Sequence, residues 1–108
     1  MLHSEIIKEI AELTAENRRG AEALYECEVR LAHAENELDL IEQKAFIRAE
    51  GTVADRTALA RLEAADARLQ RDLRKAEANR VRVKIKSLES ALMATATQAK
   101  LMQAEVRL

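Results

Sequence analysis

The chain is poor in the residues that interrupt helices or fill globular cores. Its 108 residues include no proline, no tryptophan, one phenylalanine, one tyrosine and two glycines. The absence of proline removes the strongest helix breaker, and a globular core of this size normally needs several aromatic side chains. The apolar residues are mainly Leu, Ile, Val and Ala, which suit a thin seam between helices. With 34% charged residues, this composition is typical of long helices and coiled coils.

Long apolar runs and paired cysteines are also missing. No stretch approaches the roughly 18 apolar residues of a membrane span, and the first five residues lack the basic start and apolar core of a signal peptide. Cys27 is the single cysteine, so it cannot form an internal disulfide. These features predict a cytoplasmic protein in a reducing compartment.

The sequence offers no set of residues for catalysis or metal binding. His3 and His33 are far apart, and with one cysteine no zinc pattern exists. The flanking Glu26 and Glu28 disfavour a thiolate at Cys27. The two glycines are 31 residues apart, so there is no glycine-rich phosphate loop. We therefore predict no enzyme activity, no cofactor, and no catalytic, cofactor-binding or metal site.

A heptad repeat runs through the first half of the chain. Its a positions are Ile10, Asn17, Leu24, Leu31, Leu38 and Ala45, and its d positions are Ile6, Leu13, Gly20, Cys27, Ala34 and Ile41. About six heptads of this spacing predict a coiled-coil helix. Asn17 is the polar exception, and a buried Asn at an a position commonly fixes the register of pairing.

Helix stop and start signals meet near the middle. Gly51 can end a helix in the left-handed conformation, and Thr52 can cap the next helix, with Asp55 completing a capping box. A short connection makes consecutive helices antiparallel neighbours. We predict an all-α fold for residues 1–108, a long antiparallel two-helix coiled-coil hairpin, with helix 1 over about 4–49, a turn at 50–52 and helix 2 over about 53–106. The alternative is one continuous helix in a parallel dimer that tolerates Gly51.

Two apolar stripes are visible in the second half. The first contains Leu59, Leu62, Leu69, Leu73 and Ala76, with Asp66 interrupting it. The second contains Val81, Ile85, Leu88, Leu92, Thr95, Ala99, Met102 and Val106. The second stripe is one residue out of phase with the first, which predicts a local change of register between Ala76 and Val81.

Charge divides between the two halves. Residues 1–50 hold 6 basic and 12 acidic residues, whereas residues 51–108 hold 12 basic and 7 acidic residues. The segment 68–86 is the most basic, and the residues in it that could contact nucleic-acid phosphates are Arg71, Arg74, Arg82 and Lys84. The alternative is that these charges pair with acidic residues of helix 1 and set the register. No aromatic residue interleaves with them to stack on bases.

The two ends of the chain should meet in a hairpin, and apolar residues there outnumber the positions of one seam. Residues 90–99 carry no charge. The predicted interface residues are Ile7, Leu92, Met93, Leu101, Met102 and Leu108. An uncovered apolar stripe marks an interface, so we expect a homodimer or higher oligomer, most simply a two-fold four-helix bundle. A helix from another protein is the competing occupant.

Residues 44–60, KAFIRAEGTVADRTALA, and 86–92, KSLESAL, resemble segments of small helical proteins encoded by tailed phages and prophages in replication and recombination gene modules. The resemblance implies an accessory factor that acts with a recombinase, a single-strand-binding protein or a replisome component, and it carries over no catalytic residue. The predicted function is therefore a non-enzymatic coiled-coil interaction factor, with an unidentified protein partner besides itself. The alternatives are a nucleic-acid-binding accessory protein and a structural scaffold or spacer.

Overall fold

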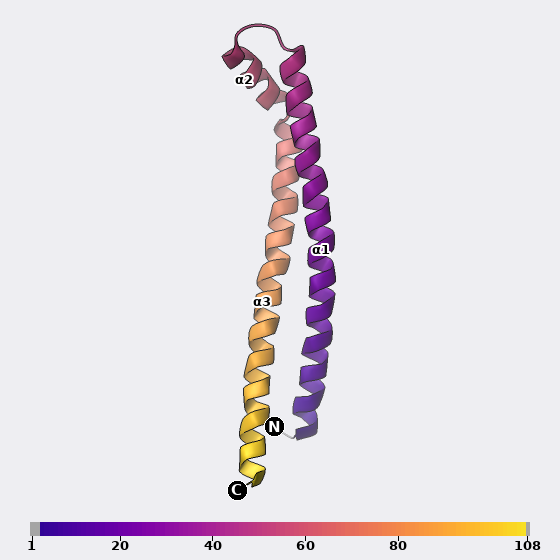
Figure 1. Cartoon of the computed structure of the whole chain (residues 1–108), viewed down its shortest axis with the longest axis vertical. Helices are drawn as coiled ribbons and strands as arrows, with labels where there is room; N and C mark the ends of the chain where they lie inside the picture. Colours follow the sequence, from indigo (N-terminus) through magenta and orange to yellow (C-terminus); the bar gives the residue numbers. More distant parts are fainter. Residues whose placement is uncertain (1–2, 108) are drawn as a thin grey trace. The chain divides into compact units, whose positions relative to one another are not determined.

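The chain is an all-α helical hairpin, as the sequence predicts. The structure is a computed structural model that describes residues 3–107, and its regular elements are α1 (His3–Arg48), α2 (Val53–Glu63) and α3 (Ala65–Arg107) (Figure 1). Its contacts separate into two compact units. Unit 1 combines α1 up to Leu24 with α3 from Arg80 onwards, and unit 2 comprises Tyr25–Asn79.

The predicted seam of α1 is confirmed by burial. All twelve of its a and d positions are buried or half-buried. Ile6 in unit 1 and Cys27, Leu38 and Ala45 in unit 2 are the most enclosed. The 3-4 spacing of the sequence therefore identifies the face of α1 that packs against the returning helix in each unit.

In unit 2, residues 49–52 connect α1 to α2 with the predicted caps. Gly51 has a φ of 112°, a conformation that L side chains rarely adopt. Thr52 is the N-cap of α2: its hydroxyl accepts from the Asp55 backbone N–H at 3.2 Å, and its own N–H donates to the Asp55 carboxylate at 3.4 Å. This reciprocal pair satisfies two donors at the start of the helix.

The single helix expected over 53–106 is divided at Ala64. Its backbone has φ −88° and ψ 6°, outside regular α-helix, and its N–H is shared between the carbonyls of Ala60 and Leu62. Within unit 2, Figure 1 shows α2 set at an angle to the first turns of α3. Asp66 falls in the first turn of α3, where its carboxylate interacts favourably with the positive end of the helix dipole. It is exposed and does not interrupt a core.

The prediction that the first apolar stripe of the second half forms the seam is wrong. Leu59, Leu62, Leu69, Leu73 and Ala76 are all exposed. Arg56 and Arg68 are half-buried, and the other buried or half-buried positions of residues 53–79 are Ala60, Ala64, Ala67, Arg71, Arg74 and Ala78. It is this second group that follows the seam. These keep 4-3 spacing in sequence with the second predicted stripe, so the expected change of register does not occur. Alanine allows close helix approach, and the arginines pack their aliphatic stems while the charged ends remain outside.

In unit 1, the second stripe forms the seam as predicted, apart from Val106. Leu88 and Thr95 are buried, and the Thr95 hydroxyl donates to the carbonyl of Ala91 at 2.9 Å. Val106 is exposed. His3 shares a hollow with Met102, and Gly20 lies against Ile85, so the two helices of this unit run antiparallel.

Candidate functional site

The predicted interface residues of unit 1 fall into two groups. Leu92 and Met102 are half-buried seam residues. Ile7, Met93 and Leu101 lie outside the seam and are 56%, 73% and 61% exposed. The sixth predicted residue, Leu108, lies outside the described residues. The structure therefore presents large apolar side chains from both α1 and α3 on the surface of this unit.

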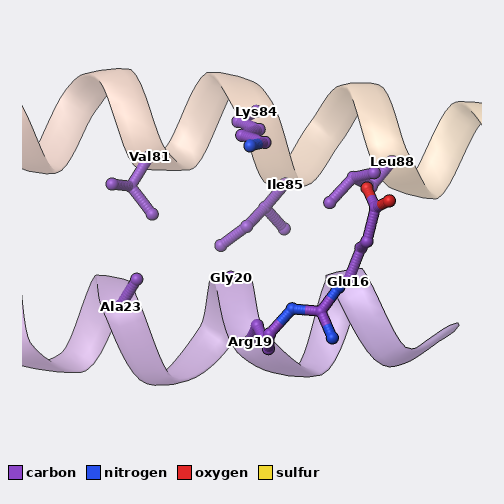
Figure 2. A pocket seen from close by; sticks show the side chains of 8 residues that line it. All are labelled: Glu16, Arg19, Gly20, Ala23, Val81, Lys84, Ile85 and Leu88. Atoms are coloured by element: carbon purple, nitrogen blue, oxygen red, sulfur yellow. The ribbon is translucent and has the colours of Figure 1, made fainter. Parts of the chain in front are cut away.

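A hollow of about 480 Å³ opens between the helices of unit 1 at Gly20. Figure 2 shows Ile85 of α3 pointing at Gly20, with Val81 and Ala23 on one side and Leu88 on the other. A Cβ added to Gly20 would lie 3.0 Å from Ile85 Cγ1. The absent side chain thus admits Ile85, and the space beside it remains open.

Asn17, the predicted register residue, lies one turn before Gly20. It is half-buried, and its Oδ1 is fully enclosed with no hydrogen-bond donor among the described residues. Leaving a buried acceptor unpaired costs about 1–3 kcal/mol. The seam of unit 1 therefore contains a polar position that lowers stability, and the role of Asn17 in setting the register stays a prediction.

The four residues predicted as candidates for nucleic-acid contact are divided between the two units. Arg71 and Arg74 belong to unit 2, and Arg82 and Lys84 to unit 1. Arg71 donates to Asp72 at 2.7 Å and Arg74 to Glu77 at 3.1 Å. Arg82 is half-buried, whereas Lys84 is exposed at the Gly20 hollow.

Arg68 of the basic segment pairs with the opposite helix in unit 2. Arg68 Nη2 donates to Glu42 Oε1 of α1 at 2.9 Å. Arg71 and Arg74 form their ion pairs within α3 instead, although both are half-buried in the seam of unit 2. The proposed charge pairing between helices thus holds for Arg68 but not for these two arginines.

Sequence reasoning missed a groove in unit 2 beside the turn. It has a volume of about 380 Å³ and is lined by Glu42, Gln43, Phe46, Ile47, Thr57, Ala60 and Arg61. The Arg56 guanidinium covers the Phe46 ring at 4.2 Å, and its Nε donates to the Phe46 carbonyl at 3.0 Å. The one signal in the sequence was the only phenylalanine, placed close to a turn with small residues after it.

Metal binding and membrane crossing find no support in the part of the chain that the structure describes. Residues 3–107 contain no cluster of three or more His, Cys, Asp or Glu side chains arranged for a metal ion. Across the same residues, none of the helices combines the length and the apolar character needed to cross a membrane. Cys27 is a buried small residue, as predicted, and accepts a hydrogen bond from Arg30 Nη2 at 3.4 Å.

Comparison of the chain with protein-family models, with curated proteins and with solved structures gave no match.

Proposed function

We propose that this protein is a non-enzymatic coiled-coil interaction factor that associates with itself through unit 1. One observation carries the proposal: Ile7, Met93 and Leu101 stand outside the seam and are more than half exposed. A two-helix pair can cover one stripe on each helix, and here the seam already uses it. Large exposed apolar residues on both helices of one unit are candidates for an interaction surface.

Burial of these apolar side chains would favour association. Burying a large apolar side chain contributes roughly 1.5–3 kcal/mol. A two-fold dimer would bury each of these residues in both copies of the chain. Such a dimer brings two helix pairs together as a four-helix bundle, the simplest closed assembly for this geometry. Leu92 and Met102, half-buried at the edge of the seam, would then be covered from the outside.

Analytical ultracentrifugation tests self-association. We expect the wild type to sediment as a dimer or higher oligomer at tens of micromolar, and the double variant Met93→Glu with Leu101→Glu to sediment as a monomer of unchanged helicity. Leu69→Glu is the matched control, because Leu69 is a similarly exposed leucine of α3 in unit 2. A monomeric wild type refutes self-association.

We further propose that the factor serves phage DNA replication or recombination in the cytoplasm, bound to a protein partner. The resemblance of residues 44–60 and 86–92 to phage-encoded helical proteins supports this assignment. Direct nucleic-acid binding is less well supported, because Arg68, Arg71 and Arg74 are all engaged by carboxylates. A scaffold or spacer without a ligand would leave the exposed apolar residues without a role.

A further inference from the structure

The groove beside the turn of unit 2 combines an apolar floor with unpaired positive charge. Phe46 and Ile47 of α1 and Ala60 of α2 supply its apolar surface. Ile47 is 74% exposed, so its side chain is open to contact from outside. Small residues on α2, Ala60 and Thr57, leave the space that a larger side chain would fill.

Side-chain contacts join the elements that form the groove. The Arg56 guanidinium stacks on Phe46 and bonds to its carbonyl. The ion pair between Arg48 and Glu63, with a 2.7 Å separation, joins the end of α1 to the end of α2. These contacts hold α2 against the end of α1 and so define the two walls of the groove.

The charges around the groove are unbalanced. Its one carboxylate, Glu42, is already paired with Arg68 at 2.9 Å. Arg61 lines the groove, and Lys44 lies beside Ile47 in an adjoining hollow. Neither of these two cations has an ion-pair partner among residues 3–107. A complementary ligand therefore carries carboxylates next to its apolar group.

We propose that this groove binds an acidic segment of another protein, inserting one large apolar side chain against Phe46, Ile47 and Ala60 while its carboxylates meet Arg61 and Lys44. Buried apolar anchors with a charged rim are the usual construction of such contacts. The inference rests on the proposed function in that the chain binds protein partners, and it uses a surface in unit 2 rather than the self-association surface of unit 1.

Fluorescence anisotropy of a labelled peptide tests the groove with the full chain. The probe is an eight-residue peptide of Asp, Ser and Gly with one central Phe, and the comparison peptides replace Phe with Ala or each Asp with Lys. We expect saturable binding of the probe, weakened by about tenfold or more in both comparison peptides. Absence of saturable probe binding up to about 1 mM overturns the proposal.

Protein variants locate the binding. Arg61→Glu should weaken probe binding by about tenfold or more, and Thr57→Leu should block it by filling the groove while helicity is unchanged. Lys75→Glu is the matched control, because Lys75 is another exposed cation of unit 2 without an ion-pair partner among the described residues. Equal effects of Arg61→Glu and Lys75→Glu would show unspecific attraction and reject the site, as would full binding by Thr57→Leu.

Self-association is measured separately by sedimentation of the same variants. Unchanged oligomeric mass in Arg61→Glu and Thr57→Leu supports a foreign partner at the groove. Loss of the oligomer in both of these variants would instead place a second copy of the chain in the groove and overturn the inference. A monomeric wild type that still binds the probe refutes self-association and leaves the groove intact.

Discussion

Arg68 of α3 and Glu42 of α1 form an ion pair between the two arms of the hairpin in unit 2, with Nη2 2.9 Å from Oε1. Their side chains are 29% and 35% exposed, against 69% and 55% for Arg48 and Glu63. The partial shielding of the first pair reduces solvent screening, whereas exposed pairs contribute little.

A double-mutant cycle should distinguish these two ion pairs. We expect a coupling energy of about 1 kcal/mol between Glu42→Gln and Arg68→Gln, and about 0.3 kcal/mol between Glu63→Gln and Arg48→Gln. Urea unfolding followed by circular dichroism provides the free energies. Equal coupling in the two cycles would show that burial does not determine the strength of these pairs.

Thr52→Ala should destabilise the hairpin by about 1 kcal/mol, because it removes the hydroxyl that accepts from the Asp55 N–H at the start of α2. The control is Thr57→Ala, since the Thr57 hydroxyl bonds to the Val53 carbonyl inside the helix and caps nothing. Thermal unfolding measures both. An effect of Thr57→Ala as large as that of Thr52→Ala would contradict the capping role.

Asn17→Leu should stabilise the protein by about 1–3 kcal/mol, because it replaces a buried acceptor that has no donor among the described residues. Asn36→Leu, at an exposed position of α1, should change the unfolding free energy by less than about 0.5 kcal/mol. The measurement is chemical denaturation at a fixed protein concentration, since self-association shifts apparent stability. A destabilised Asn17→Leu would mean that the amide forms a stabilising interaction in solution.

Gly20→Ala should raise stability by up to about 1 kcal/mol, the helix propensity gained inside α1. The new Cβ would lie 3.0 Å from Ile85 Cγ1, and the adjoining hollow gives Ile85 room to move by the few tenths of an ångström required. Gly20→Leu should instead destabilise by separating the helices. If Gly20→Ala lowers the melting temperature and adding Ile85→Val restores it, the contact with Ile85 is rigid and our expectation is wrong.

Replacing Arg71 and Arg74 with Glu should lower the melting temperature, because both stems pack in the seam of unit 2. Lys84→Glu, at an exposed position of unit 1, should leave it nearly unchanged. Electrophoretic mobility shifts at two salt concentrations address the nucleic-acid alternative for the wild type. Binding that weakens steeply with salt and disappears in Lys84→Glu would favour that alternative over protein binding.

Residues of α1 show how far the sequence alone predicts this fold. The spacing of Ile6, Cys27, Leu38 and Ala45 identifies the buried face, because nearly every seam residue there is apolar or small. Gly51 and Thr52 likewise predict the turn through local backbone chemistry. These features depend on residues that are close in sequence, so they can be predicted without the structure.

The start of α3 could not be predicted in the same way. Leu69 and Leu73 are more apolar than Ala67, Arg71 or Ala78, yet the leucines are the exposed residues. Ala67 and Ala78 are small enough for α3 to lie close to α1, and Arg71 contributes its aliphatic stem. Which face is buried therefore depends on the opposite helix rather than on side-chain hydrophobicity. Following the 4-3 spacing backwards from Val81 would have identified the correct face.

The candidate groove depends on a backbone feature with no local signal. Ala64, where α2 ends, is neither glycine nor proline, and alanine is the best helix former. Only the folded structure shows that α2 is set at an angle to the first turns of α3 and that Phe46 and Ile47 line a common hollow. By contrast, exposed Ile7, Met93 and Leu101 follow from counting apolar residues against available seam positions.

The break at Ala64 also allows α2 to open and close at a rate that differs from that of α3. A helix of 11 residues is too short to persist alone in water, so its amide hydrogens stay protected from solvent exchange only while α2 rests on the end of α1. Because the interruption separates its hydrogen-bond ladder from that of α3, α2 can open without melting its neighbour. Deuterium uptake should therefore be faster in residues 53–63 than in residues 65–79, and a ligand in the groove should slow it.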